Sequence, residues 1–289
     1  MQLKQNSPEW LEWRNKGIGA SDAPIIMGLS PWKTPYRLWL EKTTGKSDFQ
    51  GNRATERGHE LEDTARKCAE KKLSKMFFPH CFEHKTYNWM RASLDGISLD
   101  GYLLEIKCPY RPEHPDSDHQ KAKQGKIPDK YYPQLQHQLE VSQVDKGWYF
   151  SFDGDDGIAI PFERDEKFIA DLLEKEKAFW ECVQTLKAPK MTEKDYQVVK
   201  EQEALKKSQK ILELRKKLEA IHAELDPLEK EIKEKYCQET CAVIGDLRFT
   251  RFVKKGNINY DLVPQLQGVN LEKYRNSSVV GFRISHIGK

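Results

Sequence analysis

The chain has 289 residues, of which 38% are hydrophobic and 32% are charged, and its formal net charge is +3. This length suits one large domain, or an ordinary domain with an attachment, and the apolar content suffices for a core. With so small a net charge, any affinity for nucleic acid must come from a local patch. No stretch reaches the roughly 18 apolar residues of a membrane helix. The polar start of the chain lacks a secretory signal, so we expect a cytoplasmic protein.

The six cysteines form no CxxC pair and are typical of reduced cytosolic thiols. Cys68, His80, Cys81 and His84 lie close together in the sequence, but their spacing fits no standard zinc pattern. We therefore interpret them as separate core and surface residues.

The first 190 residues alternate helical and strand signals and predict one mixed α/β domain. Helical periodicity and caps such as Ser7 mark the helices, while β-branched and aromatic residues mark the strands. The expected helices cover residues 8–16, 34–43, 54–73, a segment after Pro133, and 166–186. The expected strands form a hairpin within residues 87–107, which turns at Asp100-Gly101, and a pair at 147–152 and 158–162.

Residues 191–238 form a second segment, in which the composition shifts to Lys, Glu and Leu. Its apolar residues recur at alternating steps of three and four, which is the seam of a coiled coil. A helix packed on its own domain explains the pattern equally well, and Pro227 predicts a kink or a break. The seam consists of Ile211, Leu214, Leu218, Ile221, Leu225, Leu228 and Ile232.

Residues 239–289 form a third segment, which we expect to be a small α+β domain. Strands are expected at 241–244, 247–253 and 279–284, and a helix at 261–274. Residues 240–289 hold eight basic and three acidic side chains, a net charge of +5. Such a basic end favours contact with nucleic acid or a protein partner, and a solubilising surface is the alternative.

The strongest chemical signal is Asp95 followed, beyond a turn, by Glu105-Ile106-Lys107. Hydrolysis of a phosphodiester needs a divalent cation that polarises the phosphate and lowers the pKa of the attacking water. Mg²⁺ prefers a few carboxylate oxygens, with positions left for water and phosphate. Lys107 lies two residues beyond Glu105 and so shares its strand face, where an ammonium can orient the water or offset negative charge.

The length of the turn decides whether the two carboxylates meet. A two-residue turn would project Asp95 and Glu105 from opposite faces. A three-residue loop at residues 99–101, ending in a left-handed glycine, would pair Ser98 with Tyr102 and Asp95 with Glu105. The two acidic Cβ atoms would then lie roughly 5 Å apart, and the carboxylates would repel unless a cation lay between them. We therefore expect this register, or a bulge with the same effect, and a bound metal.

With these residues, the chain resembles the YqaJ/lambda-exonuclease family of phage recombination nucleases, within the PD-(D/E)xK superfamily. The resemblance covers about residues 5–185 and leaves out the coil and the basic end. It implies a restriction-endonuclease-like mixed sheet flanked by helices, followed here by a helical coil and a small α+β extension. Its motifs are Trp10, Arg14 and Gly17-Ile-Gly-Ala-Ser21-Asp22; Arg57-Gly-His-Glu-Leu-Glu62-Asp; Leu104-Glu-Ile-Lys-Cys-Pro109; and Tyr131-Tyr-Pro-Gln134-Leu-Gln.

The resemblance also implies roles for single residues. Asp95 and Glu105 would be metal ligands, the carbonyl of Ile106 a further ligand, and Glu62 a helix carboxylate near the metals. Lys107 would be the catalytic lysine, with Gln134 beside it. The alternative for each is an ordinary surface or core position.

A pocket for a terminal 5′-phosphate would consist of Arg14, Ser21 and Ser93, which suits the bidentate donors of Arg and the neutral donor of Ser. Tyr131 would face the DNA or the core. Lys121 and Lys123 lie in what we expect to be a long loop after the catalytic strand, where they would hold the DNA backbone. A solvated surface is the alternative for this loop.

The implied activity is a Mg²⁺-dependent exonuclease, with Mn²⁺ as an alternative ion and a two-metal site. It would resect linear double-stranded DNA from 5′-phosphorylated ends and leave 3′ single strands for a single-strand annealing recombinase. A homo-oligomer such as a ring trimer, in the cytoplasm of a bacterial host cell, is expected. One alternative is a structure-specific or site-specific endonuclease on the same fold. Another is a non-catalytic DNA-binding or scaffold protein, which the presence of all four catalytic residue types disfavours.

Overall fold

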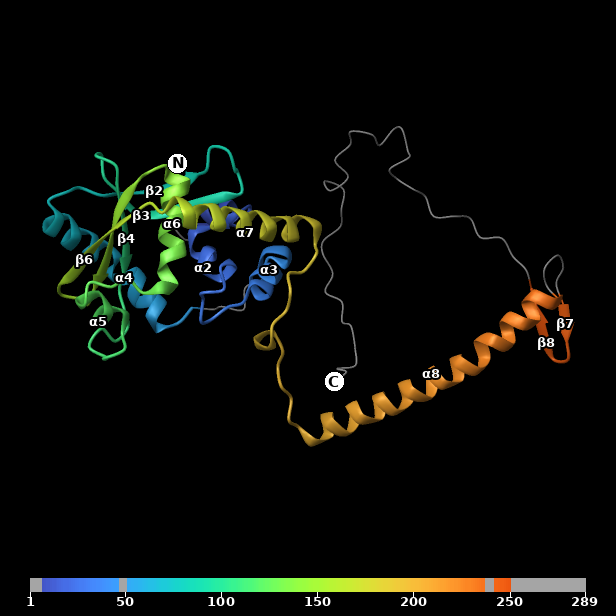
Figure 1. Cartoon of the computed structure of the whole chain (residues 1–289). Helices are drawn as coiled ribbons and strands as arrows, with labels where there is room; N and C mark the ends of the chain where they lie inside the picture. The colour runs from blue at the N-terminus through green and yellow to red at the C-terminus, as the bar shows by residue number, and fades with distance from the viewer. Residues whose placement is uncertain (1–6, 47–50, 237–241, 251–289) are drawn as a thin grey trace. The chain divides into compact units, whose positions relative to one another are not determined.

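The computed structural model describes residues 7–46, 51–236 and 242–250. Its internal contacts divide the chain into two units, residues 1–196 and 197–289, and each is described by itself (Figure 1). None of the described helices combines the length and the apolar character that crossing a bilayer requires.

The first unit is built on a mixed sheet of six strands. β4 runs parallel to β5, and β1 parallel to β3, while the remaining neighbours are antiparallel. The mixed α/β domain predicted from the alternating signals is confirmed, as is the mixed sheet that the family resemblance implies. The strand order is β1 (Ile18–Gly19), β3 (Met90–Ile97), β4 (Tyr102–Lys107), β5 (Lys146–Phe152) and β6 (Gly157–Glu163), and β2 (Phe78–Glu83) also pairs with β3.

Helices begin where the sequence places caps. The side chains of Ser7, Thr34 and Asp165 accept the backbone N–H three residues ahead, which satisfies a donor that the first turn leaves free. The predicted helices are present within a few residues of their expected ends, whereas β2, α2 and α5 were not predicted. The helices are α1 (Pro8–Asn15), α2 (Ala23–Ile26), α3 (Pro35–Thr44), α4 (Arg53–Leu73), α5 (Asp118–Lys123), α6 (Tyr132–Ser142) and α7 (Glu166–Thr185).

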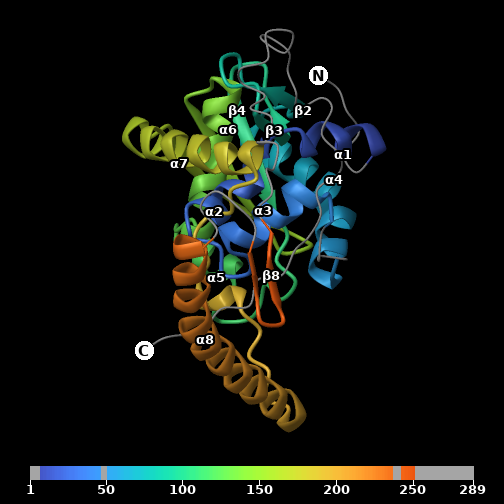
Figure 2. The same cartoon turned by 90° about the vertical axis from the view of Figure 1, so that its right-hand side faces the viewer.

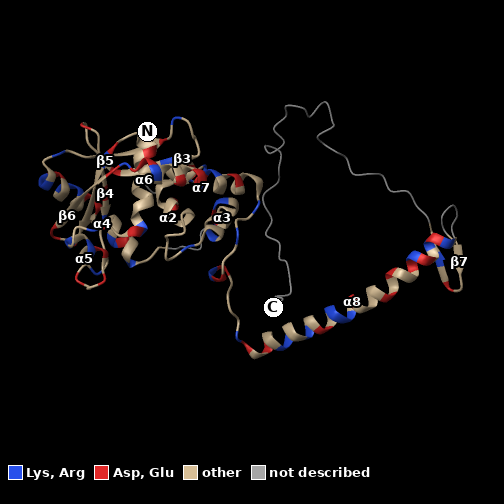
Figure 3. Cartoon of the chain, viewed as in Figure 1, with Lys and Arg blue, Asp and Glu red and all other residues tan. Residues whose placement is uncertain are grey.

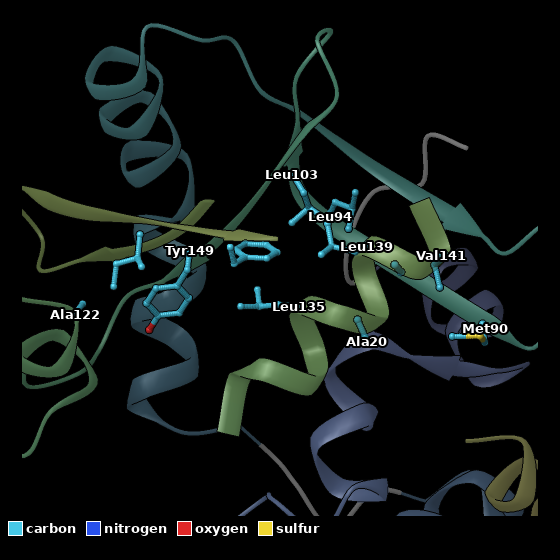
Figure 4. Close-up of a cluster of buried hydrophobic side chains, with 12 residues drawn as sticks. Ala20, Met90, Leu94, Leu103, Ala122, Leu135, Leu139, Val141 and Tyr149 are labelled. Atoms are coloured by element: carbon cyan, nitrogen blue, oxygen red, sulfur yellow. The ribbon is translucent and has the colours of Figure 1, made fainter. Parts of the chain in front are cut away.

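The two faces of the sheet bury different helices. Leu104 and Ile106 of β4 belong to a cluster with Ala65 and Ala69 of α4. Leu103, one residue away and so on the opposite face, belongs to a cluster with Leu135 and Leu139 of α6 (Figure 4). α7 packs in turn against α6 and α3 (Figure 2). Because Glu105 and Lys107 alternate with Leu104 and Ile106, they project toward α6.

A buried ion pair joins α6 to α7. The Nδ1 of His137 lies 2.8 Å from Glu176 Oε1, its Nε2 lies 3.0 Å from the carbonyl of Arg91, and both side chains are fully buried. Burial lowers the pKa of His137, but the Glu176 carboxylate outweighs this effect and raises it overall. Burial also raises the pKa of Glu176. The pair therefore retains a proton inside the core.

This pair predicts that alkaline pH destabilises the first unit. A group whose folded pKa is raised stabilises the fold fully below its unfolded pKa, about 6.5 for His, and this stabilisation is lost as pH rises through the folded value. The midpoint of thermal unfolding should fall as pH rises above neutrality. Glu176→Gln, which keeps a hydrogen-bond acceptor, should flatten that profile relative to the wild type. A wild-type midpoint that rises over the same range would contradict the prediction.

The second unit contains α8 (Gln202–Tyr236) and a hairpin of β7 (Ala242–Ile244) and β8 (Leu247–Phe249). α8 continues through Pro227, so the break considered there does not occur. The hairpin matches two of the strands expected in the basic end. The strand expected at 279–284 and the helix expected at 261–274 lie outside the described residues.

Candidate active site

The hairpin between β3 and β4 has the predicted three-residue tip. Gly101 has a φ of +76°, a left-handed conformation that glycine adopts without strain. The N–H of Ser98 donates to the carbonyl of Tyr102 at 2.9 Å, and pairing continues in the same register to Gly96 and Leu104. This register carries the two acidic residues of the hairpin toward each other.

Asp95 does not form the direct ladder pair predicted for it, because β3 has a bulge at this point. Leu94 and Ile97 are three residues apart, yet they pair with residues of β2 that are only two apart, which leaves one extra residue around Asp95-Gly96. Bulges re-aim side chains and interrupt pairing. The Oδ2 of Asp95 accepts the N–H of Ile106 at 2.7 Å, so the side chain replaces a ladder hydrogen bond.

The sheet forks at the same place. β2 pairs along one edge of β3, and two strands share the other edge: β4 at Gly96-Ile97 and β1 at Met90-Arg91. Among the described strands, none pairs with the residues between these two pairings on that edge. Asp95 lies in this gap, where a substrate can approach carboxylates that a continuous sheet would cover.

Glu105 is held by three donors and is only 2% exposed. Lys107 Nζ lies 2.5 Å and Gln134 Nε2 2.6 Å from its Oε1, and Gln138 Nε2 lies 2.6 Å from its Oε2. Gln134 and Gln138 are one helical turn apart on α6 and therefore project to the same side. α6 thus sets the direction in which the Glu105 carboxylate points.

Glu62 on α4 brings a third carboxylate to this region. Burial raises the pKa of Glu62, and Glu105 raises it further against the opposing effect of Arg66. Burial first, and then Glu105 and Glu62, raise the pKa of Asp95 well above its ordinary value. Glu105 thus lies close enough to both Asp95 and Glu62 to disfavour their charged forms.

Lys107 is the cation nearest to these acids. Burial acts to lower its pKa, but the carboxylates of Glu105 and Asp95 raise it overall, so the side chain stays charged at neutral pH. Its Nζ lies 5.0 Å from the centre of the Tyr131 ring. An ammonium fixed between carboxylates and a ring can contact a phosphate or an attacking water.

The donor set fits a hard divalent cation such as Mg²⁺ or Mn²⁺, because all of the donors are oxygens and three carboxylates share this region with Lys107 and Arg66 as the neighbouring cations. Within the described part of the chain, no three Asp, Glu, His or Cys side chains converge closely enough to hold an ion by themselves. Asp95, Glu105 and the carbonyl of Ile106 would therefore hold the ion together with water and phosphate oxygens, with Glu62 nearby.

The predicted phosphate pocket is brought together around Trp10. The Nη2 of Arg14 donates to Ser21 Oγ at 2.6 Å, and its guanidinium lies 5.1 Å from the centre of the Trp10 ring. The ring Nε1–H of Trp10 donates to Ser93 Oγ at 3.3 Å. Arg14, Ser21 and Ser93 thus form one polar group, and Ser93 lies two residues before Asp95.

One cleft of about 1220 Å³ connects the acidic group to this pocket. This volume exceeds the range of typical small-molecule sites, so the cleft can hold several nucleotides. The residues predicted for the site that line it are Arg14, Ser21, Glu62, Ser93, Asp95, Glu105, Ile106, Lys107, Tyr131 and Gln134.

Lys121 and Lys123 are not among the lining residues of the cleft. They belong to α5, a helix that Ser117 caps, so the prediction of an unstructured lysine loop is wrong for this part. Lys130, from the same segment, does line the cleft and forms an ion pair with Asp118 at 2.6 Å. Asp118 also accepts the Tyr131 hydroxyl at 2.9 Å, which fixes that ring beside Lys107.

Two residues that support the site were not predicted. Gln138 follows Gln134 by four residues, and this helical spacing was the signal for it. The Nη1 of Arg66 donates to the carbonyl of Asp95 at 3.2 Å and ties α4 to the bulge. Arg66 follows Glu62 by four residues, so the two share a helix face, but nothing in the sequence indicates what that face contacts.

The first unit matches known proteins along most of its length. Residues 9–145 match the family described as the YqaJ-like viral recombinase domain. We refer to this part of the chain, by its similarity to that family, as the YqaJ-like domain. It contains every residue that the sequence analysis assigned to catalysis, metal binding or the phosphate pocket.

The protein YqaJ of Bacillus subtilis (strain 168), described as uncharacterized, is 33% identical over 179 residues. The match covers 60% of this chain and 54% of YqaJ, so the chain spans about half the length of that relative. The YqaJ-like domain also resembles the structure of LHK-Exo, an alkaline exonuclease from Laribacter hongkongensis, and of LHK-Exo in complex with dAMP.

The similarity to LHK-Exo confirms the restriction-endonuclease-like fold. The complex is 26% identical with a TM-score of 0.55, and the match covers 62% of this chain and 94% of LHK-Exo. The other structure gives a TM-score of 0.54 at the same identity and coverage. α8 and the basic end account for most of the sequence outside this match.

Proposed function

We propose that the protein is a metal-dependent deoxyribonuclease whose catalytic residues are Asp95, Glu105 and Lys107. The observation that carries this proposal is the shared cleft in which the carboxylates of both strands meet a half-buried lysine at the fork of the sheet. An alkaline exonuclease with the same fold supports the choice of reaction.

Each residue of the site has a separate role in phosphodiester hydrolysis. Asp95, Glu105 and the Ile106 carbonyl would hold a divalent ion, which supplies Lewis acidity and lowers the pKa of water when bound. Lys107 orients the attacking water and offsets the charge that develops on the phosphate. Gln134 and Gln138 keep Glu105 oriented through hydrogen bonds from their carboxamides.

We further propose that the enzyme is an exonuclease that resects duplex DNA from the 5′ end. Arg14, Ser21 and Ser93 form a group of donors suited to a terminal phosphate, in the same cleft as the acidic residues. The product would be a 3′ single strand, which suits a single-strand annealing recombinase as the next protein to act. The description of the family as a viral recombinase domain supports this context.

A homo-oligomer, such as a ring trimer around the DNA, is our proposal for the active form; any pairing with two-fold symmetry outside the ring would then join chains of two different rings. Mg²⁺ is the proposed ion, with Mn²⁺ as the substitute and two ions as the expected number. Lys121 and Lys123, on α5, are proposed only as outlying contacts to the phosphate backbone, since neither lines the cleft.

Digestion of end-labelled linear duplex with Mg²⁺ tests this function. We expect nucleotides to be released from 5′ ends and a 3′ single strand to accumulate, with no activity in EDTA. Release from 3′ ends alone would contradict the polarity, and cutting of closed circles would instead indicate an endonuclease. Binding without any cleavage would indicate a scaffold protein.

The phosphate pocket predicts a selective effect of Arg14→Ala. A hydrogen bond from Arg to a phosphate contributes about 1.5–3 kcal/mol, so kcat/KM on 5′-phosphorylated ends should fall about 10- to 100-fold. Activity on 5′-hydroxyl ends should change little. Lys16→Ala, which removes an exposed cation next to α1, is the matched control. An equal loss on both kinds of end would show that Arg14 does not recognise the phosphate.

A further inference from the structure

Within the second unit, the described residues leave a long apolar seam on α8 uncovered. Six of its seven members, Ile211 to Leu228, are 40–60% exposed, and they recur over about two and a half heptads. Long exposed apolar stripes are uncommon on helices that act alone, because a soluble helix gains its stability by packing such a face. We therefore expect another apolar surface to pack on the seam along its full length.

The charges beside the seam identify that occupant. The residues directly before Ile211, Leu218, Leu225 and Ile232 are Lys210, Lys217, Glu224 and Glu231. The residues directly after Leu214, Ile221 and Leu228 are Arg215, His222 and Glu229. Both flanks thus change from basic to acidic along the helix, and Figure 3 shows charges of both signs on α8.

We infer that α8 pairs with α8 of a second copy of this chain in an antiparallel coiled coil. Antiparallel pairing brings the basic half of each helix beside the acidic half of the other. With Leu218 packed on Ile221 of the second copy, the flanking Lys217 lies beside Glu224 of that copy. The same register packs Ile211 on Leu228 and pairs Lys210 with Glu231, and the two-fold axis repeats every pair.

A parallel pair of the same helices is disfavoured by the same residues. In a parallel coil, the residue directly before a seam position such as Ile211 lies beside the residue five positions further along the partner helix. Lys210 would then meet Arg215, and Glu224 would meet Glu229, so both ends of the coil would place like charges together. The intrahelical pair of Lys210 with Glu213, 3.3 Å apart and exposed, is weak enough to exchange for an interhelical one.

Pro227 is compatible with this pairing. It lies between Asp226 and Leu228 on the side of α8 away from the seam, and the helix continues past it. Proline removes one backbone hydrogen bond and favours a slight bend. The seam residues on either side, Leu225 and Leu228, remain on one face of the helix.

Sedimentation of the full chain over a range of concentrations tests the pairing. The double variant Leu218→Gln, Ile221→Gln keeps helix-forming side chains and should weaken association at least about 100-fold. Lys217→Glu converts two symmetry-related attractions into repulsions and should weaken it about tenfold at low salt. Adding Glu224→Lys to that variant exchanges the charges and should restore wild-type association.

Lys216→Glu is the matched control, because it makes the same charge change away from the seam and should leave association unchanged. Circular dichroism confirms that each variant keeps its helix content. The inference is overturned if the wild type is monomeric at tens of micromolar, which would mean that something other than a second copy covers the seam. It is also overturned if the glutamine variants associate as the wild type does, or if Lys217→Glu strengthens association, which a parallel coil would predict.

Discussion

Asp95→Asn is expected to lower the rate of DNA cleavage by about a thousandfold or more, because the substitution removes a ligand charge from the metal site. The fold should persist. An asparagine oxygen can still accept the N–H of Ile106, and the new side chain has the same size. The metal-free variant should be at least as stable as the wild type, since the carboxylate it loses is one whose pKa burial, Glu105 and Glu62 raise.

Thermal unfolding with and without Mg²⁺ separates metal binding from chemistry. A ligand that binds only the folded state raises the unfolding midpoint, so Mg²⁺ should stabilise the wild type and have little effect on Asp95→Asn. Binding of duplex DNA in EDTA should be equal for the two proteins. Retained cleavage in Asp95→Asn would show that the metal site lies elsewhere.

Lys107→Met is expected to lower kcat about 100- to 1000-fold while metal binding is retained. Methionine fills nearly the same volume but has no charge, so the attacking water loses its orienting group and the developing charge loses its counterion. The Mg²⁺-dependent rise in the unfolding midpoint should persist, because Asp95 and Glu105 are unchanged. This is the opposite of the pattern expected for Asp95→Asn.

Lys175→Met serves as the control for the loss of a lysine. Lys175 lies on α7, half exposed and paired with Asp171, and it does not line the cleft. Its replacement should leave kcat unchanged. If Lys107→Met cleaved DNA at the wild-type rate, or lost its response to Mg²⁺, Lys107 would have to be regarded as a structural partner of Glu105 alone.

The central part of the fold could be predicted because the signals are local. Caps at Ser7 and Asp165 and the left-handed Gly101 depend on neighbouring residues, so pattern and turn chemistry were sufficient. β2 was missed, since its burial pattern does not alternate cleanly and it includes a proline. α5 was missed because a helix of six residues produces almost no periodicity.

The residues of the site were predicted better than their geometry. The motifs around Asp95, Glu105 and Lys107 identify the chemistry, whereas the bulge that turns Asp95 arises from its pairing with a strand that was not predicted. The contact of Arg66 with the Asp95 carbonyl depends on how α4 packs across the sheet. The spacing of residues in the sequence does not indicate such tertiary contacts.

The tip of the catalytic hairpin lies a few residues beyond the acidic residues, where β3 and β4 meet. Leu99 is 93% exposed, and four residues, or roughly 13 Å of strand, separate it from Asp95. If each strand gains one residue at the tip, the existing cross-strand pairs keep their register. Glu105 then still projects toward α6. An insertion at this tip should therefore leave the catalytic group unaltered, and a label attached at Leu99 would leave the cleft open, because residues 98–101 do not line it.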